Sequence, residues 1–336
     1  MSRGASTHRI DQLPILVLFP HNRCNCRCVM CDIWKIREVR EITDTDLAPH
    51  VSGMTELGVK WIVLSGGEPL MHSDLPALCG MLRREGIRLT LLTAGLSIEE
   101  HALSITRLFD DVIVSIDGPI EVHDRIRGVP GAFRHLNDGV RALRRLRPEI
   151  PVHGRCTVQK QNFRKLGDTV RAAHALKLSS LSFLAADLTS SAFNRPDGWT
   201  AQRQAHTALN PDETEALGNE IEALEAECRP DFQSGFILES PEKLGRIVRH
   251  FRAALGQVGA VAPRCNAPWV SAVIEADGSV RPCFFHSSIG NIHDHLLPEI
   301  LNGEEALEFR RELDVATNAT CRNCVCSLYV PEETDA

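Results

Sequence analysis

The chain has no long apolar segment: none of its apolar runs reaches the roughly 18 residues that a membrane-spanning helix needs. Its first apolar run, residues 13–19, is short, and the charges before it are scattered. No small-residue cleavage site follows this run, so the pattern does not match a signal peptide. The sequence therefore predicts a cytoplasmic protein with no membrane partner.

The chain also lacks an excess of positive charge. It has 37 basic and 44 acidic residues, which gives a net charge of −7. A general nucleic-acid binder is more often basic, because it must neutralise phosphates, so we expect no nucleic-acid partner. Internal repeats and low-complexity tracts are absent as well. With 43% apolar and 24% charged residues, the 336 residues suit one large globular domain, or one large and one small.

Cysteine, by contrast, is plentiful and unevenly spread. Of twelve cysteines, four fall between Cys24 and Cys31 and five between Cys265 and Cys326. In a reducing cytosol such clusters indicate metal or redox chemistry more often than disulfides. The remaining three stand alone and are expected to be small buried apolar side chains, or in one case a hydrogen-atom donor near a substrate: Cys79, Cys156 and Cys228.

Strand-like and helix-like segments alternate through the first two thirds of the chain. Repeated alternation of this kind predicts a parallel sheet with helices outside it. Six such units predict an α/β fold, a partial (β/α)6 barrel similar to a TIM barrel but open. The expected strands lie at residues 14–19, 61–64, 88–93, 112–115, 152–158 and 181–185.

The last third of the chain does not continue this alternation of strands and helices. A polar loop is expected at residues 187–209, followed by a helix that Asn210 caps and Pro211 begins. Farther on, the turn at residues 275–278 joins two short apolar runs and predicts a β-hairpin, with short helices after it. We expect a core domain at residues 12–205, a connecting helix and linker at 206–234, and a small C-terminal hairpin and helix domain at 235–330.

The first cysteine cluster contains the spacing Cys24-x3-Cys28-x2-Cys31. Three thiolates on one short loop can hold three irons of a [4Fe–4S] cluster, which commonly has four cysteine ligands. The fourth iron then keeps an open position, as a catalytic metal requires. On spacing alone, a zinc site and plain thiols are the alternatives. Cys26 lies between the ligands and is expected to be a surplus thiol.

This three-cysteine loop resembles that of the radical S-adenosylmethionine (radical SAM) superfamily. The resemblance implies that the open iron chelates the amino and carboxylate groups of SAM. An electron then cleaves SAM to a 5′-deoxyadenosyl radical, which abstracts a hydrogen atom from a substrate. Met30 stands where the family often has an aromatic residue. Its polarisable thioether can still pack on an adenine face.

A second motif, Ser65-Gly66-Gly67-Glu68-Pro69, follows the second expected strand. It resembles the family's Gly-Gly-Glu-Pro motif, which implies that Gly66, Gly67, Glu68 and Pro69 bind the methionine end of SAM. Glycine permits close approach of the backbone to a ligand, and a carboxylate pairs with an ammonium group. The alternative is an ordinary turn between strand and helix.

A third stretch combines Ser115-Ile116-Asp117-Gly118 with His123-Asp124-x2-Arg127-Gly128. It resembles the branch of the family that carries extra C-terminal clusters. The resemblance implies that Ser115 and Asp117 lie near SAM, at its ribose or methionine end. It also implies a contact of Arg155 with the SAM carboxylate, for which a structural salt bridge is the alternative.

These motifs follow different expected strands. In α/β barrels, ligand sites gather at the carboxyl ends of the strands. The cysteine loop, the glycine motif and Ser115 each stand where a strand ends, and so does Thr93, in Thr93-Ala94-Gly95 where the family often has Thr-Asn-Gly. We therefore expect these motifs to face one ligand.

The second cysteine cluster consists of two single cysteines and a close pair. Four such thiolates can hold zinc or an iron–sulfur cluster. The pattern resembles the SPASM and Twitch extensions of radical SAM enzymes, and it implies a shortened form with one auxiliary [4Fe–4S] cluster. Cys326 is then a spare or alternate ligand, and the implied ligands are Cys265, Cys283, Cys321 and Cys324.

The resemblance indicates a radical SAM oxidoreductase or a related enzyme that needs a reducing donor such as flavodoxin or ferredoxin. The first hypothesis is hydrogen abstraction from a small metabolite, a sugar or aminocyclitol that is dehydrogenated or epimerised. The alternative is a maturase that modifies a peptide or protein. It is weakened by the expectation that no leader-binding domain fits in the roughly twelve residues before the first strand. A non-catalytic metal-binding or electron-transfer protein would leave the glycine motif without a purpose. The sequence singles out no catalytic residue.

Overall fold

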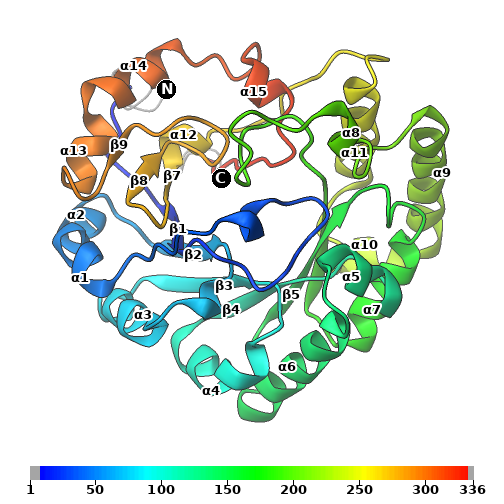
Figure 1. Ribbon diagram of the computed structural model, residues 1–336, viewed down its shortest axis with the longest axis horizontal. Coiled ribbons are helices and arrows are strands. Elements are labelled where there is room, and N and C mark those ends of the chain that lie inside the picture. Colours follow the sequence, from blue (N-terminus) through cyan, green and yellow to red (C-terminus); the bar gives the residue numbers. More distant parts are fainter. Residues whose placement is uncertain (1–7, 332–336) are drawn as a thin grey trace. The chain divides into compact units, whose positions relative to one another are not determined.

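The computed structural model describes residues 8–331 and divides them into two compact units, each assembled from distant parts of the chain (Figure 1). Residues 8–23, 36–91 and 262–331 form the first unit, and residues 24–35 and 92–261 form the second. No described helix is long and apolar enough to cross a membrane.

The first unit is built on a mixed sheet in which β1 is central. β1 pairs in parallel with β2 on one side and with β7 on the other, so that Ile15 lies between Trp61 and Ser271. Leu16 and Leu18 of β1 share one face of the sheet and are fully buried, whereas Val17 on the other face is half-buried. The strand order is β3 (Arg88–Thr93), β2 (Trp61–Gly66), β1 (Ile15–His21), β7 (Ser271–Ile274), β8 (Ser279–Arg281) and β9 (Gly290–Asn291).

The helices of the first unit come from both ends of the chain. Thr43 begins α1 with a capping box that includes Asp46. A tail helix, α13, packs against α2, and the Leu297 N–H donates to Nδ1 of His50 at 3.2 Å (Figure 1). The helical elements are α1 (Asp44–Leu47), η2 (Ala48–His50), α2 (Val51–Glu56), η3 (Pro69–Met71), α3 (Leu75–Arg84), α12 (Ala267–Val270), α13 (Leu297–Asn302), α14 (Glu304–Glu312) and α15 (Ala319–Arg322).

The predicted hairpin is confirmed. β7 and β8 run antiparallel, and Gly278 takes a left-handed conformation with φ of +82° in the turn between them. Asp277 supports the turn, because its carboxylate accepts from the Ser279 N–H at 3.0 Å. The hairpin therefore ends two residues before Cys283.

The second unit contains three parallel strands flanked by helices. β5 pairs with both β4 and β6, and α4 and α6 pack together so closely that a Cβ on Gly139 would lie 2.6 Å from Ile98. Asn210 caps α9 as predicted. The elements are β4 (Asp111–Ser115), β5 (Val152–Val158), β6 (Ser180–Ala185), η1 (Ile33–Lys35), α4 (Ile98–Leu108), α5 (Ile120–Arg127), α6 (Ala132–Leu146), α7 (Leu166–Ala175), α8 (Ala201–Gln204), α9 (Pro211–Glu227), α10 (Arg229–Ser234) and α11 (Pro241–Ala254).

The free edge of β6 is covered by an extended segment after α10. The Leu181 N–H donates to the Phe236 carbonyl at 2.6 Å, and the Leu238 N–H donates to the Leu181 carbonyl at 3.0 Å. The buried Glu239 carboxylate then accepts from the Phe183 N–H at 2.7 Å. An edge strand paired in this way does not present free donors to other chains.

The alternation of six strands, β1 to β6, with helices confirms the predicted α/β class. The helical stretch of residues 44–56 is divided into α1, η2 and α2, because Pro49 lacks the N–H that a continuous helix would use. The domain division at residues 12–205, 206–234 and 235–330 stays a prediction. The compact units of the structure join other segments, and α11 belongs to the second unit.

Candidate functional site

The cysteine loop of residues 24–31 belongs to the second unit. Cys26 and Cys28 are buried, whereas Cys24 and Cys31 are half-buried. The Cys26 thiol lies between its neighbours, and hydrogen bonds with Cys24 and Cys28 raise its pKa. The hydrogen bond from Cys26 lowers the pKa of Cys28 to about 7, so this thiol readily becomes the thiolate that a metal binds.

The end of α5 holds this loop through backbone hydrogen bonds. The Arg27 N–H donates to the Arg127 carbonyl at 2.8 Å, and the Val29 N–H donates to the Ile126 carbonyl at 3.0 Å. Gly128 ends the helix in the left-handed region with φ of +65°, and a Cβ there would lie 2.6 Å from the Arg27 carbonyl oxygen. The Arg127-Gly128 pair, used above only as a family signature, is therefore the clamp of the cysteine loop.

A buried ion pair lies behind Cys28. Nη2 of Arg127 is 2.6 Å from Oδ2 of Asp117, and the two side chains are 8% and 0% exposed. Nη1 of Arg127 lies 3.6 Å from the Cys28 sulfur, within hydrogen-bond range for sulfur. The other Asp117 oxygen accepts from the Thr157 N–H at 3.1 Å. Asp117 is thus linked to the cysteine loop through Arg127. Its contact with SAM stays a prediction.

His123, which lies on α5 with Arg127, supports Asp117. The Asp117 N–H donates to Nδ1 of His123 at 3.2 Å, and the imidazole ring packs edge-on against Phe133. The imidazole is fully buried, and this burial lowers its pKa from 6.5 to about 3. The ring is therefore neutral and acts as an acceptor in the folded protein.

The buried His123 predicts a loss of stability in acid. The unfolded chain binds a proton at this imidazole below pH 6.5, whereas the folded chain does so only near pH 3. The free energy of unfolding should therefore fall as the pH drops through this window, by up to about 1.4 kcal/mol per pH unit from this group. Urea titrations at several pH values give the free energy of unfolding as a function of pH. This free energy should fall less steeply toward acid pH in His123→Gln than in wild type, and as steeply as in wild type in the exposed His206→Gln. Equal slopes for wild type and His123→Gln would contradict this prediction.

The segment at residues 187–209, predicted as a loop, is fastened to the cysteine loop. Nε1 of Trp199 donates to the Asp32 carboxylate at 2.7 Å. Nη2 of Arg203, from α8, donates to the Val29 carbonyl at 2.6 Å. These contacts place the segment on the residues that surround Cys31, and no sequence pattern indicated them.

The same segment is braced internally. Arg195 and Asp187 form a buried ion pair at 2.7 Å, and the Arg195 guanidinium lies 4.3 Å from the centre of the Trp199 ring. A paired and stacked guanidinium fixes the position of the indole. Trp199 therefore holds Asp32 in a defined geometry.

The glycine motif lies in the first unit, where β2 ends. The Gly67 N–H donates to the His21 carbonyl at 3.2 Å, and the Glu68 N–H donates to the Arg23 carbonyl at 2.7 Å. The Glu68 side chain is fully buried, and its carboxylate accepts from the Leu70 N–H at 3.2 Å as the cap of η3. The motif thus shapes the turn after β2, and its contact with SAM stays a prediction.

Replacing Gly67 by alanine is expected to destabilise the protein, because the new Cβ would overlap the Arg23 carbonyl oxygen. Overpacking of this kind commonly costs about 1–3 kcal/mol. Gly80, inside α3, has open space around it, so Gly80→Ala should instead stabilise by about 0.5–1 kcal/mol. Thermal unfolding of both variants measures this difference, and a Gly67→Ala variant as stable as wild type would refute the close approach.

Ser115 and Arg155 lie side by side. They are paired residues on β4 and β5, and the Ile116 N–H donates to the Arg155 carbonyl at 2.9 Å. Arg155 is exposed, and among residues 8–331 it forms no ion pair, so the alternative of a structural salt bridge is not found. Met30 is half-buried in the turn before Cys31. The SAM contacts of all three residues stay predictions.

The tail cysteines of the first unit face one another. Burial, and to a smaller extent charges on Cys321 and Cys265, raise the pKa of Cys283 to about 11. The pKa of Cys324 is raised by burial and then by its neighbours Cys326, Cys283 and Cys265. Cys265 thus acts electrostatically on both Cys283 and Cys324, and all four side chains are half-buried.

Backbone contacts close this tail site. The Asn266 N–H donates to the Leu328 carbonyl at 2.9 Å, which holds the end of the described chain beside Cys265. Cys326 is exposed, and its carbonyl accepts from the Cys324 thiol at 2.9 Å. Nε2 of His286, a half-buried side chain, lies 3.5 Å from the Cys321 sulfur.

Within residues 8–331, no three histidine, cysteine or acidic side chains gather tightly enough for a single metal ion. A four-iron cluster places each cysteine on a different iron, and it therefore needs its sulfurs farther apart than one ion does. Thiols supply the expected donor at both sites, and at the cysteine loop one thiol has a lowered pKa. The residues fit iron–sulfur clusters at both places.

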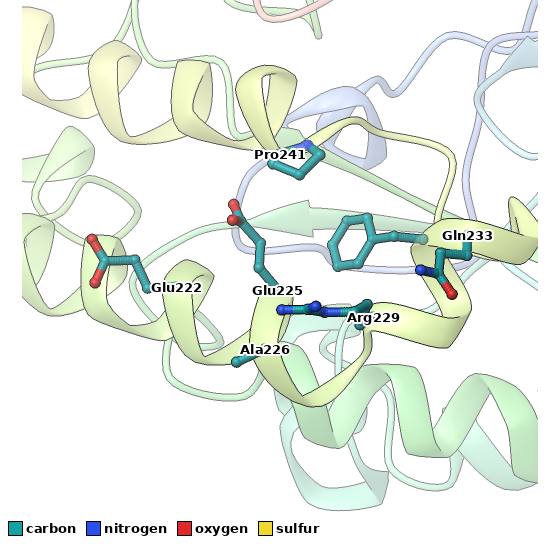
Figure 2. Close-up of a pocket in the computed structure, with 7 residues that line it drawn as sticks. Glu222, Glu225, Ala226, Arg229, Gln233 and Pro241 are labelled. Atoms are coloured by element: carbon teal, nitrogen blue, oxygen red, sulfur yellow. The ribbon is translucent and has the colours of Figure 1, made fainter.

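A pocket of about 530 Å³ lies between α9, α10 and α11 of the second unit. Figure 2 shows Glu222 and Glu225 on α9 with Arg229 beside them, and Pro241 on the opposite wall. No residue predicted for the site lines this pocket. We assign it no part in the chemistry of the cysteine loop.

Comparison with known proteins agrees with both cysteine sites. The model of the radical SAM superfamily matches residues 18–173, and that of the SPASM iron–sulfur cluster-binding domain matches residues 265–325. The second match is narrower than the predicted domain at 235–330. It covers the four tail cysteines as far as Cys324.

Similar proteins align along most of the chain. The Fe-coproporphyrin III synthase of Methanosarcina barkeri is 28% identical over 335 residues, with 94% of this chain and 81% of that protein covered. The PqqA peptide cyclase of Ruegeria pomeroyi is 24% identical over 314 residues, with 90% and 77% covered. Streptococcus suis SuiB, solved with its precursor peptide SuiA, shares the fold at a TM-score of 0.64 and 13% identity, with 97% and 74% covered.

These matches confirm the predicted α/β class and the two kinds of cofactor. The superfamily model implies a [4Fe–4S] cluster with SAM, and the SPASM model implies auxiliary iron–sulfur binding. The chain is therefore an enzyme with a radical SAM domain at residues 18–173 and a C-terminal SPASM-type iron–sulfur domain at residues 265–325.

Proposed function

We propose that this enzyme modifies a peptide or protein by radical chemistry. A cluster on Cys24, Cys28 and Cys31 supplies, when bound, the electron that cleaves SAM. The cysteine loop carries this part of the proposal, because α5 and residues 187–209 hold it from two sides. Gly66 to Pro69, Ser115, Asp117, Arg155 and Met30 are the proposed SAM-binding residues. One auxiliary [4Fe–4S] cluster is proposed on Cys265, Cys283, Cys321 and Cys324.

The substrate class rests on the similar proteins. A peptide cyclase aligns with 90% of this chain, and the fold is shared with an enzyme solved with a precursor peptide. These findings support the peptide alternative better than the first hypothesis of a sugar or aminocyclitol. The reducing donor, such as a flavodoxin or ferredoxin, remains part of the proposal.

A second candidate substrate is a tetrapyrrole. It is favoured by the synthase of Methanosarcina barkeri, which is named for Fe-coproporphyrin III and aligns with 94% of this chain. The two candidates differ in a property that is easily tested, since a protease destroys a peptide and spares a porphyrin.

The test measures 5′-deoxyadenosine formed by anaerobically reconstituted enzyme with dithionite and SAM. Three additions are compared: an extract of the source cells, the same extract after digestion and removal of the protease, and the tetrapyrrole fraction purified from these cells. We expect the extract to raise 5′-deoxyadenosine formation severalfold and digestion to abolish the increase. An increase that survives digestion would overturn the peptide proposal, and an increase with the tetrapyrrole fraction alone would establish the second candidate.

A further inference from the structure

The buried pair of Arg127 and Asp117 has no evident use in stabilising the fold. Charged side chains removed from water lose solvation that their mutual attraction seldom exceeds, and a well-packed apolar pair in such places is often as stable. Both side chains are nevertheless almost wholly buried, with Nη2 and Oδ2 2.6 Å apart. Outside the pair, Asp117 accepts from the Thr157 N–H, and Nη1 of Arg127 lies 3.6 Å from the Cys28 sulfur.

We propose that Arg127 and Asp117 set the reduction potential of the cluster bound at the cysteine loop. Hydrogen bonds to cysteine sulfur and nearby charge are among the features by which a protein tunes iron–sulfur potentials. Reduction adds one electron from the external donor and no proton, so it increases the negative charge beside Cys28. The Arg127 guanidinium stabilises that charge, and the Asp117 carboxylate holds the guanidinium in place and offsets part of its effect.

Hydrogen bonds hold both members of the pair in fixed positions beside the cysteine loop. Asp117 is held by the Thr157 N–H, and its own N–H donates to the buried His123. The Arg127 carbonyl accepts from the Arg27 N–H in the cysteine loop itself. The guanidinium therefore has little freedom to move away from Cys28 when the charge of the site changes.

The proposal assigns opposite signs to the two members of the pair. Arg127→Gln removes the positive charge and leaves Asp117, so the reduction potential should become more negative. Asp117→Asn leaves the guanidinium uncompensated, so the potential should become less negative. Arg127→Lys retains the charge and should lie closer to wild type than Arg127→Gln does. A role confined to stability would instead change iron content in the same direction in every variant.

The experiment is a redox titration of the holoenzyme followed by electron paramagnetic resonance. The relevant cluster is identified as the one whose signal changes when SAM is added. A matched control replaces the exposed pair on α7, Asp168→Asn and Arg171→Gln, whose members are 2.6 Å apart and 33% and 66% exposed. The control variants should leave the potential unchanged, because water screens their charge.

This inference rests on the proposed function of the cysteine loop. Different results of the experiment would contradict the proposed function and the tuning role. Wild-type protein without a SAM-responsive signal would defeat the proposed function. With that signal present, shifts of the same sign in Arg127→Gln and Asp117→Asn, or no shift in either, would overturn the tuning role. Loss of iron from all three variants would overturn it as well and show the pair to be only a support of the loop.

Discussion

Replacement of Cys28 by alanine is expected to abolish 5′-deoxyadenosine formation and to remove one cluster, about four irons per chain. Cys28 is the buried proposed ligand of its loop, and its pKa of about 7 favours the thiolate. An alanine offers no ligand to iron, and the two cysteines left on the loop do not suffice for a stable cluster. Iron and sulfide analysis with the SAM cleavage assay measures both effects.

The control for this prediction lies two residues away. Cys26 is equally buried, and its N–H points toward the Cys24 sulfur at 3.5 Å. Because we take Cys26 as a surplus thiol, Cys26→Ala should keep its iron and its SAM cleavage. Iron lost from Cys26→Ala but retained in Cys28→Ala would reverse the ligand assignment.

Replacement of Cys321 by alanine is expected to remove the auxiliary cluster, again about four irons per chain, and to leave SAM cleavage by dithionite-reduced enzyme intact. Cys321 belongs to the first unit, and it has Cys265 and Cys283 as neighbours. Substrate turnover should be lost, whereas 5′-deoxyadenosine still forms. The measurement pairs metal analysis with the cleavage assay.

Cys326→Ala is the matched control in the same tail. Its side chain is exposed, and its backbone carbonyl, which the substitution retains, accepts the hydrogen bond from Cys324. We expect wild-type iron content in this variant. If the wild-type protein bound one zinc ion in the tail instead of four irons, the tail would be a structural zinc site. If Cys321→Ala lost SAM cleavage as well, the two sites would be interdependent.

The strands and the presence of two cysteine-rich iron–sulfur regions were open to prediction from sequence because each depends on local pattern. Alternating apolar segments indicated β1 to β6, and the spacing of Cys24, Cys28 and Cys31 indicated a cluster loop. The turn at Gly278 was equally local, since a left-handed residue in a hairpin is commonly glycine.

The contacts that hold the loop were beyond such patterns, because they join residues far apart in sequence. The pairing of Asp32 with Trp199 spans 167 positions, and the contact of Cys28 with Arg127 spans 99. Periodicity carries no information on such pairs. The division of the helical stretch at Pro49 is different, since a proline inside a helical pattern is itself a local signal.

The most direct test of the account is the metal content and SAM chemistry of the wild-type protein. After anaerobic reconstitution, we expect about eight irons and a matching amount of sulfide per chain, from two [4Fe–4S] clusters. Addition of dithionite and SAM should then yield 5′-deoxyadenosine. A protein that binds no iron and leaves SAM intact under these conditions would contradict the account.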